Sequence, residues 1–415
     1  MIQYFKNLLL SDTGKDTGIV LAGTLINVII GGLFFILAPR ILGPADYGLF
    51  ATVVATGLMA AAIANFGIDT GILRFAKGNR EQFNKILSLA FKSYIILGVS
   101  VALIGVLLSD FIANFLNQPS ITTLLRLAFS GSILLLLTNF FIASLQAKRE
   151  FLKASIVNIL SNTIRLLILA IGAYFFTISL YFITALFFFV TIISVAVGKL
   201  WLPFEFKAIE KSQAIEFYKY NFWIASALVI SSIPFDNYFL IRVVGPVQAG
   251  LYSAPFKLLT FAYQFGGNFT RVLASRFASF DSDKKARDFA FRAMPFPLIF
   301  ILGLTILFFI SQPLVTLVFG KEYIQATEIL QILSIGFIFF FASTIPSSII
   351  LYYFGKPKIS FVITLIRYVS FVVLLALLVP LYSAKGGAFA FSVSEFFAFL
   401  FMSGYVFIKF SKNGH

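Results

Sequence analysis

The sequence predicts an all-α integral membrane protein with twelve transmembrane helices in two six-helix parallel repeats, and three observations support this. Hydrophobic residues make up 60% of the 415 residues and charged residues 12%, whereas soluble domains have roughly 45–50% and 25%. Apolar runs of about 20 residues recur, which is the length a helix needs to cross about 30 Å of hydrocarbon. The third observation is that one segment of the chain occurs twice.

The duplicated segment lies between two apolar runs in each half of the chain. Residues 40–50 (RILGPADYGLF) return 202 positions later as residues 242–252 (RVVGPVQAGLY), without a gap. The same offset maps residues 74–76 (RFA) onto residues 276–278 (RFA). Two stretches that agree on one register indicate that the two halves of the chain are repeats of one architecture. Paired halves of a many-helix membrane protein usually enclose a translocation path.

Twelve apolar runs define the predicted spans. They cover residues 17–38, 48–66, 93–115, 122–145, 155–177, 179–198, 222–242, 251–270, 293–312, 328–352, 359–380 and 388–409. Six spans per half give both halves the same orientation, related by an axis along the membrane normal. We expect one lobe at residues 1–205 and a second at residues 206–415.

The segments between spans are short. Gly43-Pro44 and Gly245-Pro246 predict turns, because glycine permits unusual backbone angles and proline cannot continue a preceding helix. The longest outer loop is expected at residues 312–327, and the segment 199–221 that joins the halves is expected to form an amphipathic surface helix. No small-residue cleavage site closes the first span, so we expect no removable signal peptide.

The distribution of cations predicts the orientation. Twenty-four of the 32 Lys and Arg residues fall in seven segments on one side of the predicted membrane. Because cytoplasmic loops are enriched in Lys and Arg, we expect a multi-pass protein of the plasma (inner) membrane with both termini in the cytoplasm. The net charge of +15 is spread over these segments, so it predicts no nucleic-acid partner.

The sequence contains few of the residues and motifs that are typical of enzymes. It has no cysteine, its single histidine is His415, and no G-x-x-x-x-G-K-[ST] motif occurs. The triplet Asp281-Ser282-Asp283 has the D-x-D pattern of metal-dependent glycosyltransferases, but it lies beside two lysines in a short polar segment and is expected to be a solvated loop. We therefore expect no catalytic residues, no metal site and no cofactor.

Two charged residues are predicted at similar depth on consecutive antiparallel helices. Asp236 lies six residues before Arg242, and Lys257 lies seven residues after Gly250, which places both roughly 10 Å from the outer ends of their helices. Charged residues within a membrane need partners and often mark functional paths. The pair is either a structural salt bridge or part of a site for ions or substrate.

Two arginines occupy corresponding spans of the halves. Arg165 is in the fifth span and Arg367 in the eleventh. An unpaired guanidinium in a bilayer is costly, so both are expected to face the interior or a water-filled cavity, where they would favour an anionic substrate. The alternative is snorkelling or pairing with a neighbouring helix, for which Glu395 is a candidate partner.

Three further arginines lie at the predicted cytoplasmic ends of spans two and eight. Arg74, Arg271 and Arg276 satisfy the orientation rule and would also form a cationic mouth that captures a pyrophosphate headgroup.

Several of these segments resemble one family. Residues 40–50 resemble the first-loop signature of the polysaccharide or oligosaccharide flippases, the polysaccharide biosynthesis proteins of the multidrug/oligosaccharidyl-lipid/polysaccharide exporter superfamily. Residues 235–257, with Asp236 and Lys257 at motif positions, resemble the pattern of that family at helices seven and eight. Residues 318–326 resemble its outer F-G-x-x-Y segment.

The resemblance implies a V-shaped pair of six-helix lobes that opens alternately to the two membrane faces. The implied cargo is an undecaprenyl-pyrophosphate-linked oligosaccharide, moved from the cytoplasmic to the outer leaflet. An H⁺ or Na⁺ gradient or the membrane potential would drive this transport. The other implied partners are the surrounding membrane lipid and polysaccharide assembly proteins. Its charged and hydroxyl-rich headgroup needs a protein path because an unsatisfied polar group in hydrocarbon costs several kcal/mol.

Three alternatives stay open. A drug/cation antiporter of the same superfamily would be expected to concentrate acidic residues in its cavity, and the predicted intramembrane acids are Asp236 and Glu395. An O-antigen polymerase or membrane glycosyltransferase is disfavoured by the short outer loops. A scaffold within a polysaccharide assembly complex is compatible with everything in the sequence.

Overall fold

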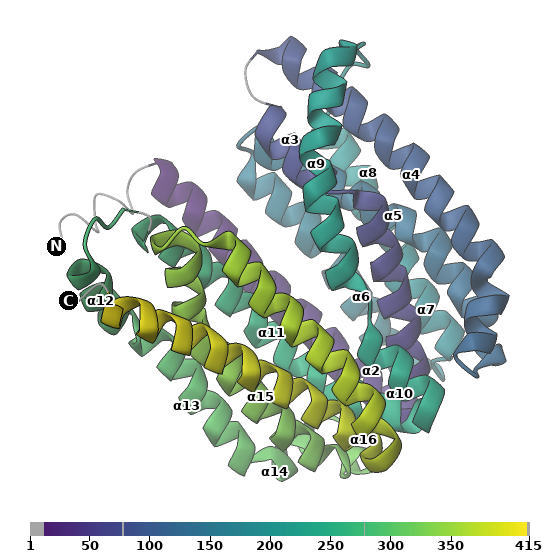
Figure 1. Ribbon diagram of the computed structural model, residues 1–415. Helices are drawn as coiled ribbons and strands as arrows, with labels where there is room; N and C mark the ends of the chain where they lie inside the picture. The colour runs from purple at the N-terminus through teal and green to yellow at the C-terminus, as the bar shows by residue number, and fades with distance from the viewer. Residues whose placement is uncertain (1–11, 77–78, 278, 413–415) are drawn as a thin grey trace. The chain divides into compact units, whose positions relative to one another are not determined.

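The structure is a computed structural model that describes residues 12–76, 79–277 and 279–412, and throughout these ranges its regular elements are helices (Figure 1). Two compact units divide the chain. The first comprises Met1–Leu42 and Leu49–Pro234, and the second comprises Gly43–Gly48 and Phe235–His415. The predicted lobe boundary after residue 205 falls within the first of these units.

The first unit contains the earlier helices of the chain. They are α2 (Asp12–Asn65), apart from its residues 43–48, then α3 (Ile68–Phe75), α4 (Arg80–Phe115), the 3₁₀ turn η1 (Pro119–Ile121), α5 (Thr122–Ala147), α6 (Phe151–Phe175), α7 (Leu180–Phe189), α8 (Thr191–Trp201) and α9 (Lys211–Ser232).

The second unit contains the remaining elements. They are α10 (Phe235–Val244), α11 (Pro246–Phe277), α12 (Asp283–Ala293), α13 (Pro295–Phe309), α14 (Ser311–Val318), the 3₁₀ turn η2 (Lys321–Tyr323), α15 (Ala326–Ser348), the π-helical turn η3 (Ile349–Tyr353) and α16 (Pro357–Lys412).

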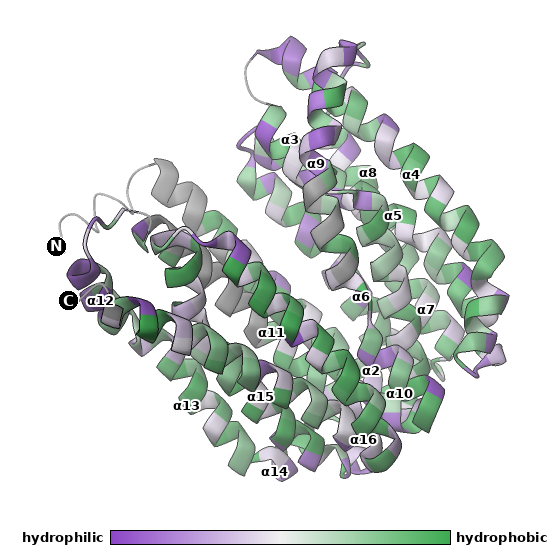
Figure 2. Ribbon diagram, in the orientation of Figure 1, coloured by the Kyte–Doolittle hydropathy of each residue, from purple (hydrophilic) through white to green (hydrophobic). Residues whose placement is uncertain are grey.

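Most of these helices are built to cross a membrane. Among the described residues, eight helical stretches are long and apolar enough for a span, and apolar residues dominate α4 and α16 in Figure 2. Two stretches, Ala22–Asn65 and Pro357–Ser411, hold 44 and 55 residues, about twice the length of one crossing. The predicted all-helical, multi-pass membrane protein is therefore confirmed, while twelve crossings in two parallel repeats stay a prediction.

Each double-length stretch contains a break in its helical backbone. In α2 the break is Gly43, at φ 70° and ψ 171°, and in α16 it is Ser383, at φ 53° and ψ −133°. Gly245 has φ 85°, and α11 begins at the following proline. Glycine reaches these angles without steric cost and proline fits a first helical position, so both predicted Gly-Pro turns are confirmed.

Three predicted single spans are interrupted. Residues 222–242 were expected to be one helix, which is wrong, because α9 ends at Ser232 and α10 begins at Phe235. Pro234 explains this break, since proline lacks a donor and restricts the residue before it. Residues 179–198 divide at Val190, and residues 293–312 divide at Ile310. At these two positions the backbone departs less from helical geometry than it does between α9 and α10.

Two predictions about connecting segments are wrong in part, although residues 211–221 of the expected linker helix do lie in α9. Residues 202–210 are not helical, because Pro203 stops the helix that precedes it. Ser88 of α4 holds this segment, accepting from the amide of Lys207 at 2.9 Å and donating to the carbonyl of Glu205 at 3.2 Å. The expected outer loop at residues 312–327 instead contains α14 and η2.

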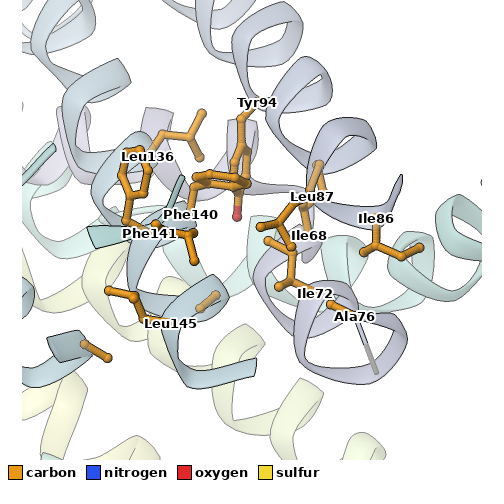
Figure 3. Packing of buried hydrophobic residues seen from close by; sticks show 14 of the residues in the cluster. Ile68, Ile72, Ala76, Ile86, Leu87, Tyr94, Leu136, Phe140, Phe141 and Leu145 are labelled. Carbon is orange, nitrogen blue, oxygen red and sulfur yellow. The ribbon is translucent and has the colours of Figure 1, made fainter. Parts of the chain in front are cut away.

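Aromatic side chains fill the core of the first unit. Ile68 and Ile72 of α3 pack with Tyr94 of α4 and with Phe140 of α5 in one buried cluster (Figure 3). Elsewhere in this unit, Phe188 of α7 lies against two glycines, one on α2 and one on α5, where an added Cβ would come within 2.4 Å of its ring or Cβ. Small residues at helix interfaces allow this close approach where lipid supplies no hydrophobic driving force.

The second unit brings the two copies of the duplicated turn together. A Cβ built on Gly48 would lie 2.0 Å from the carbonyl oxygen of Pro246, and a Cβ on Gly250 would lie 1.9 Å from that of Pro44. The contact is reciprocal, since each glycine faces the proline of the other copy. Any side chain at Gly48 or Gly250 would therefore push the backbones of the two turns apart.

We expect Gly48→Ala to lower the free energy of unfolding by about 1–3 kcal/mol. The steric cost of placing a methyl group in this backbone contact exceeds the stabilisation that the higher helix propensity of alanine provides. Gly303→Ala in α13 is the matched control, since nothing lies within 4 Å of the position that its new methyl group would take. Thermal unfolding of both purified variants in detergent measures the difference. Equal stability of the two variants would contradict this reading of the contact.

Candidate functional site

Arg165 is a buried cation of the first unit. It lies on α6 with 4% of its surface exposed. Its guanidinium donates to Asn162 Oδ1 at 2.5 Å, to the carbonyl of Phe187 at 2.6 Å and to Thr191 Oγ1 at 3.4 Å. Its Cζ also lies 4.2 Å from the centroid of the Phe187 ring and 5.6 Å from that of Phe34. The side chain is therefore held in the interior of the unit and does not snorkel.

A polar cavity of about 310 Å³ lies beside this guanidinium. Amides and hydroxyls from α2, α5, α6 and α8 line it together with Arg165 and some apolar residues. The polar lining residues are Asn65, Thr138, Asn139, Asn158, Ser161, Asn162 and Thr191. Such a concentration of neutral hydrogen-bonding groups within apolar helices can bind a polar ligand and exchange its water for protein contacts.

Hydrogen bonds fix several of these amides. The Nδ2 group of Asn162 donates to Asn27 Oδ1 at 2.7 Å, while its Oδ1 accepts from Arg165. The Oδ1 of Asn65 accepts from the Tyr94 hydroxyl at 2.9 Å. The wall is therefore preorganised by contacts between α2, α4 and α6, which lowers the ordering cost when a ligand binds.

The site carries a positive charge that the protein does not neutralise nearby. Among the described residues, no carboxylate forms an ion pair with Arg165, and its Nε is buried without a hydrogen-bond partner. A carbonyl, an amide and an aromatic face stabilise the cation without cancelling its charge. An anionic ligand would supply what the site lacks, with two or more charge-assisted hydrogen bonds.

Sequence reasoning found Arg165 and missed the amides around it. The available signal was spacing: Asn158, Asn162 and Arg165 are separated by four and three residues, so they share one face of α6. Asn65 and Asn139 lie on other helices, and nothing in their own local sequence predicts that they converge.

Arg367 follows the alternative that the sequence left open. Its Nη1 lies 2.5 Å from the Glu395 carboxylate, with 26% of the arginine side chain and 5% of the glutamate side chain exposed. The two residues lie on either side of the Ser383 break in α16. The ion pair therefore joins the two limbs of this helix and neutralises the cation.

Asp236 and Lys257 do not form the salt bridge that the sequence allowed. The structure records no ion pair between them in the part of the chain that it describes; Asp236 Oδ1 instead accepts from the amide of Asn237 at 2.9 Å. The Tyr252 hydroxyl lies near this carboxylate. Lys257 is partly buried on α11. A role for either residue in a substrate path stays a prediction.

The three arginines of the predicted cytoplasmic mouth fall in both units. Arg74 is exposed at the end of α3, with its Cζ 4.4 Å from the centroid of Tyr220. Arg276 is exposed in the last turn of α11, and Arg271 lies on the same helix with its side chain outside the described residues. That they act together stays a prediction.

The D-x-D triplet has structural roles. Asp281 pairs with Lys285 at 2.8 Å, which lowers the pKa of the aspartate. Ser282 caps α12 by accepting from the amide of Lys285, and Asp283 accepts from Tyr353. No cluster of three or more metal-binding side chains occurs in the described ranges. The expected solvated segment is therefore a helix cap.

We expect Glu395→Gln to destabilise the protein by about 3 kcal/mol, because removing one partner of a buried ion pair leaves the other charge uncompensated. The double variant Arg367→Gln/Glu395→Gln should recover part of this loss. Thermal unfolding in detergent, arranged as a double-mutant cycle with both single variants, measures the coupling. Strictly additive effects would show that the pair is not coupled in the folded protein.

Known proteins resemble this chain in sequence and in fold. A capsular polysaccharide biosynthesis protein, CapF of Staphylococcus aureus, is 29% identical over 172 residues, which cover 40% of this chain and 43% of that protein. The chain thus matches less than half the length of this relative.

Two groups of solved transporters share the fold. An inward-facing multidrug resistance transporter of the MATE family superposes with a TM-score of 0.74 at 11% identity, covering 95% of this chain and 98% of the transporter. The lipid II flippase MurJ, in an inward closed conformation, gives a TM-score of 0.72 at 15% identity, covering 95% and 90% of the two chains. At these identities the likeness establishes the fold alone.

The family assignment rests on sequence. Residues 13–280, well over half of the chain, match the family described as polysaccharide biosynthesis protein. This stretch contains both copies of the duplicated turn and all of α6 with Arg165. The chain belongs to the polysaccharide biosynthesis protein family, on a fold that it shares with the transporters of the MOP superfamily.

Proposed function

We propose that the protein is a flippase that moves an undecaprenyl-pyrophosphate-linked oligosaccharide from the cytoplasmic to the outer leaflet of the plasma membrane. The observation that carries the proposal is Arg165, a buried guanidinium without a carboxylate partner among the described residues, in a wall of amides and hydroxyls. The membership of the polysaccharide biosynthesis protein family supports this class of cargo.

The chemistry of the cavity fits both parts of such a headgroup. A guanidinium binds phosphate oxygens through planar, charge-assisted hydrogen bonds. Asparagine amides offer donors and acceptors together, which matches sugar hydroxyls that also donate and accept. With about 310 Å³ of space, the cavity would hold part of the headgroup, while the polyprenyl tail stays in lipid.

The mechanism that we propose is alternating access with twelve spans in two parallel repeats and both termini in the cytoplasm. Three arginines, Arg74, Arg271 and Arg276, would attract the pyrophosphate at the cytoplasmic side. Asp236 and Lys257 would line the path that the substrate takes through the protein. The membrane potential, worth about 2.3 kcal/mol per charge per 100 mV, or an H⁺ or Na⁺ gradient would drive the cycle.

The charge of the cavity separates this proposal from a drug/cation antiporter. A cation site needs carboxylates, whereas the residues that line the cavity of the first unit include Arg165 and none of Asp or Glu. A polymerase or glycosyltransferase is less favoured, because the D-x-D triplet caps a helix and its acids have partners in the protein.

We expect Arg165→Gln to reduce flipping by at least about tenfold, since a lost hydrogen bond to a charged group is worth about 1.5–3 kcal/mol. Arg165→Lys should fall between this variant and the wild type, because lysine keeps the charge but not the planar fork. Proteoliposomes loaded with undecaprenyl-pyrophosphate-linked oligosaccharide, with exposure of the sugar read by an externally added glycosidase, measure the rate.

Arg126→Gln is the matched control, because Arg126 lies in the same unit but pairs with Asp110 in an exposed ion pair at 2.8 Å. This variant should flip at the wild-type rate. A folded Arg165→Gln protein with unchanged flipping would refute the proposed role of the cavity. Cation-coupled drug efflux by the wild type, without flipping, would favour the antiporter.

A further inference from the structure

A second cavity lies in the second unit and differs in character from the Arg165 site. It has a volume of about 620 Å³, against about 310 Å³ for the polar cavity. Helices α12, α13, α15 and α16 line it with apolar side chains such as Leu298, Ile301 and Phe407. Arg287 of α12 is the charged residue of its lining.

Small and helix-distorting residues create this space. Ala342 and Pro346 line it from α15, and Ser403 lines it from α16. The π-helical turn η3 begins three residues after Pro346, which itself lacks a backbone donor. A Cβ on Gly404, beside Ser403, would meet nothing within 4 Å. Small residues at these positions of α15 and α16 thus leave space between the bulkier side chains that line the cavity.

The cavity has the length of one leaflet. Its lining on α16 runs from Phe399 to Ser411, which is 12 residues or about 18 Å at 1.5 Å per residue. Half of the roughly 30 Å hydrocarbon core is about 15 Å. A single acyl chain of a phospholipid would therefore lie along the cavity within one leaflet, whereas a polyprenyl chain would extend well beyond it.

The charge lies at one end of this length. Arg287 Nη2 donates to the carbonyl of Phe410 at 2.5 Å, and its Cζ lies 4.8 Å from the centroid of the Phe410 ring. This is the hydrogen bond that the structure records for the guanidinium in its described part, out of five N–H donors. Helix α12 carries four cations and two acids, a net charge of 4 − 2 = +2, and is hydrophilic in Figure 2.

We propose that this cavity is a binding site for an anionic phospholipid of the cytoplasmic leaflet. One acyl chain lies along α16 between α13 and α15, and the headgroup phosphate accepts hydrogen bonds from Arg287. The predicted orientation places α12 on the cytoplasmic side, where anionic lipids and basic residues meet. Anchoring α12 to α16 through a lipid would hold the end of the second unit together, independently of what the first unit transports.

Lipid affinities of the purified full-length protein test the proposal. Native mass spectrometry gives the dissociation constants of phosphatidylglycerol and phosphatidylcholine with matched acyl chains. We expect phosphatidylglycerol to bind about tenfold more tightly, because both lipids offer a phosphate to the guanidinium but the ammonium group of phosphatidylcholine cancels the net charge of its headgroup and is repelled by Arg287. Arg287→Gln should abolish this preference, Arg287→Lys should keep part of it, and Ala342→Phe should weaken both lipids by filling the cavity.

Arg292→Gln is the matched control, since Arg292 lies exposed on the same helix and does not line the cavity. It should keep the wild-type preference. Equal affinities of the wild type for the two lipids would overturn the proposal, as would a preference that survives in Arg287→Gln. Tighter binding of undecaprenyl phosphate in competition with phosphatidylglycerol would assign the cavity to the cargo carrier and would also overturn it.

Discussion

The backbone of this protein has no solvent to hydrogen-bond with over most of its length, and this constraint determines where the chain can bend. In hydrocarbon each N–H and C=O must find its partner within the helix. The breaks therefore fall at residues that tolerate a lost bond or an unusual angle. Gly43 and Gly245 precede prolines at the two copies of the duplicated turn, and Pro234 separates α9 from α10.

The same low-dielectric surroundings require every buried cation to have a partner, and the two units meet this requirement in different ways. Arg367 has a carboxylate, Glu395, at 2.5 Å. Arg165 has an amide, a backbone carbonyl and an aromatic ring. A carboxylate cancels the charge, whereas neutral acceptors stabilise the cation and leave its field in the cavity. Of these two arginines, Arg165 therefore keeps the capacity to bind an anion, whereas the charge of Arg367 is already paired.

Sequence reasoning predicted what depends on composition and spacing along the chain. Apolar runs predicted the membrane helices, and the Gly-Pro pairs predicted both turns, because helix length and backbone sterics are local properties. It offered Glu395 as one candidate partner, but it could not decide which acid or amide meets each arginine, since this depends on how each helix is rotated about its axis. Asp236 and Lys257 have similar predicted depths and still form no ion pair in the described structure, because depth does not fix direction.

The repeat explains why one arginine is neutralised and the other is not. Arg165 and Arg367 are separated by the offset of the duplicated turn, since 165 + 202 = 367. By the same offset, Thr364 corresponds in the sequence to Asn162 and Ser360 to Asn158. Glu395 corresponds to Ile193. The cation thus belongs to the common framework, and the partners differ between copies. Where the amides lie, the charge stays available to a ligand; where a carboxylate replaces an isoleucine, the charge becomes a structural link between two limbs of α16. The two arginines share the register of the sequence repeat, and the residues around each one determine whether its charge stays available to a ligand or is held in an ion pair.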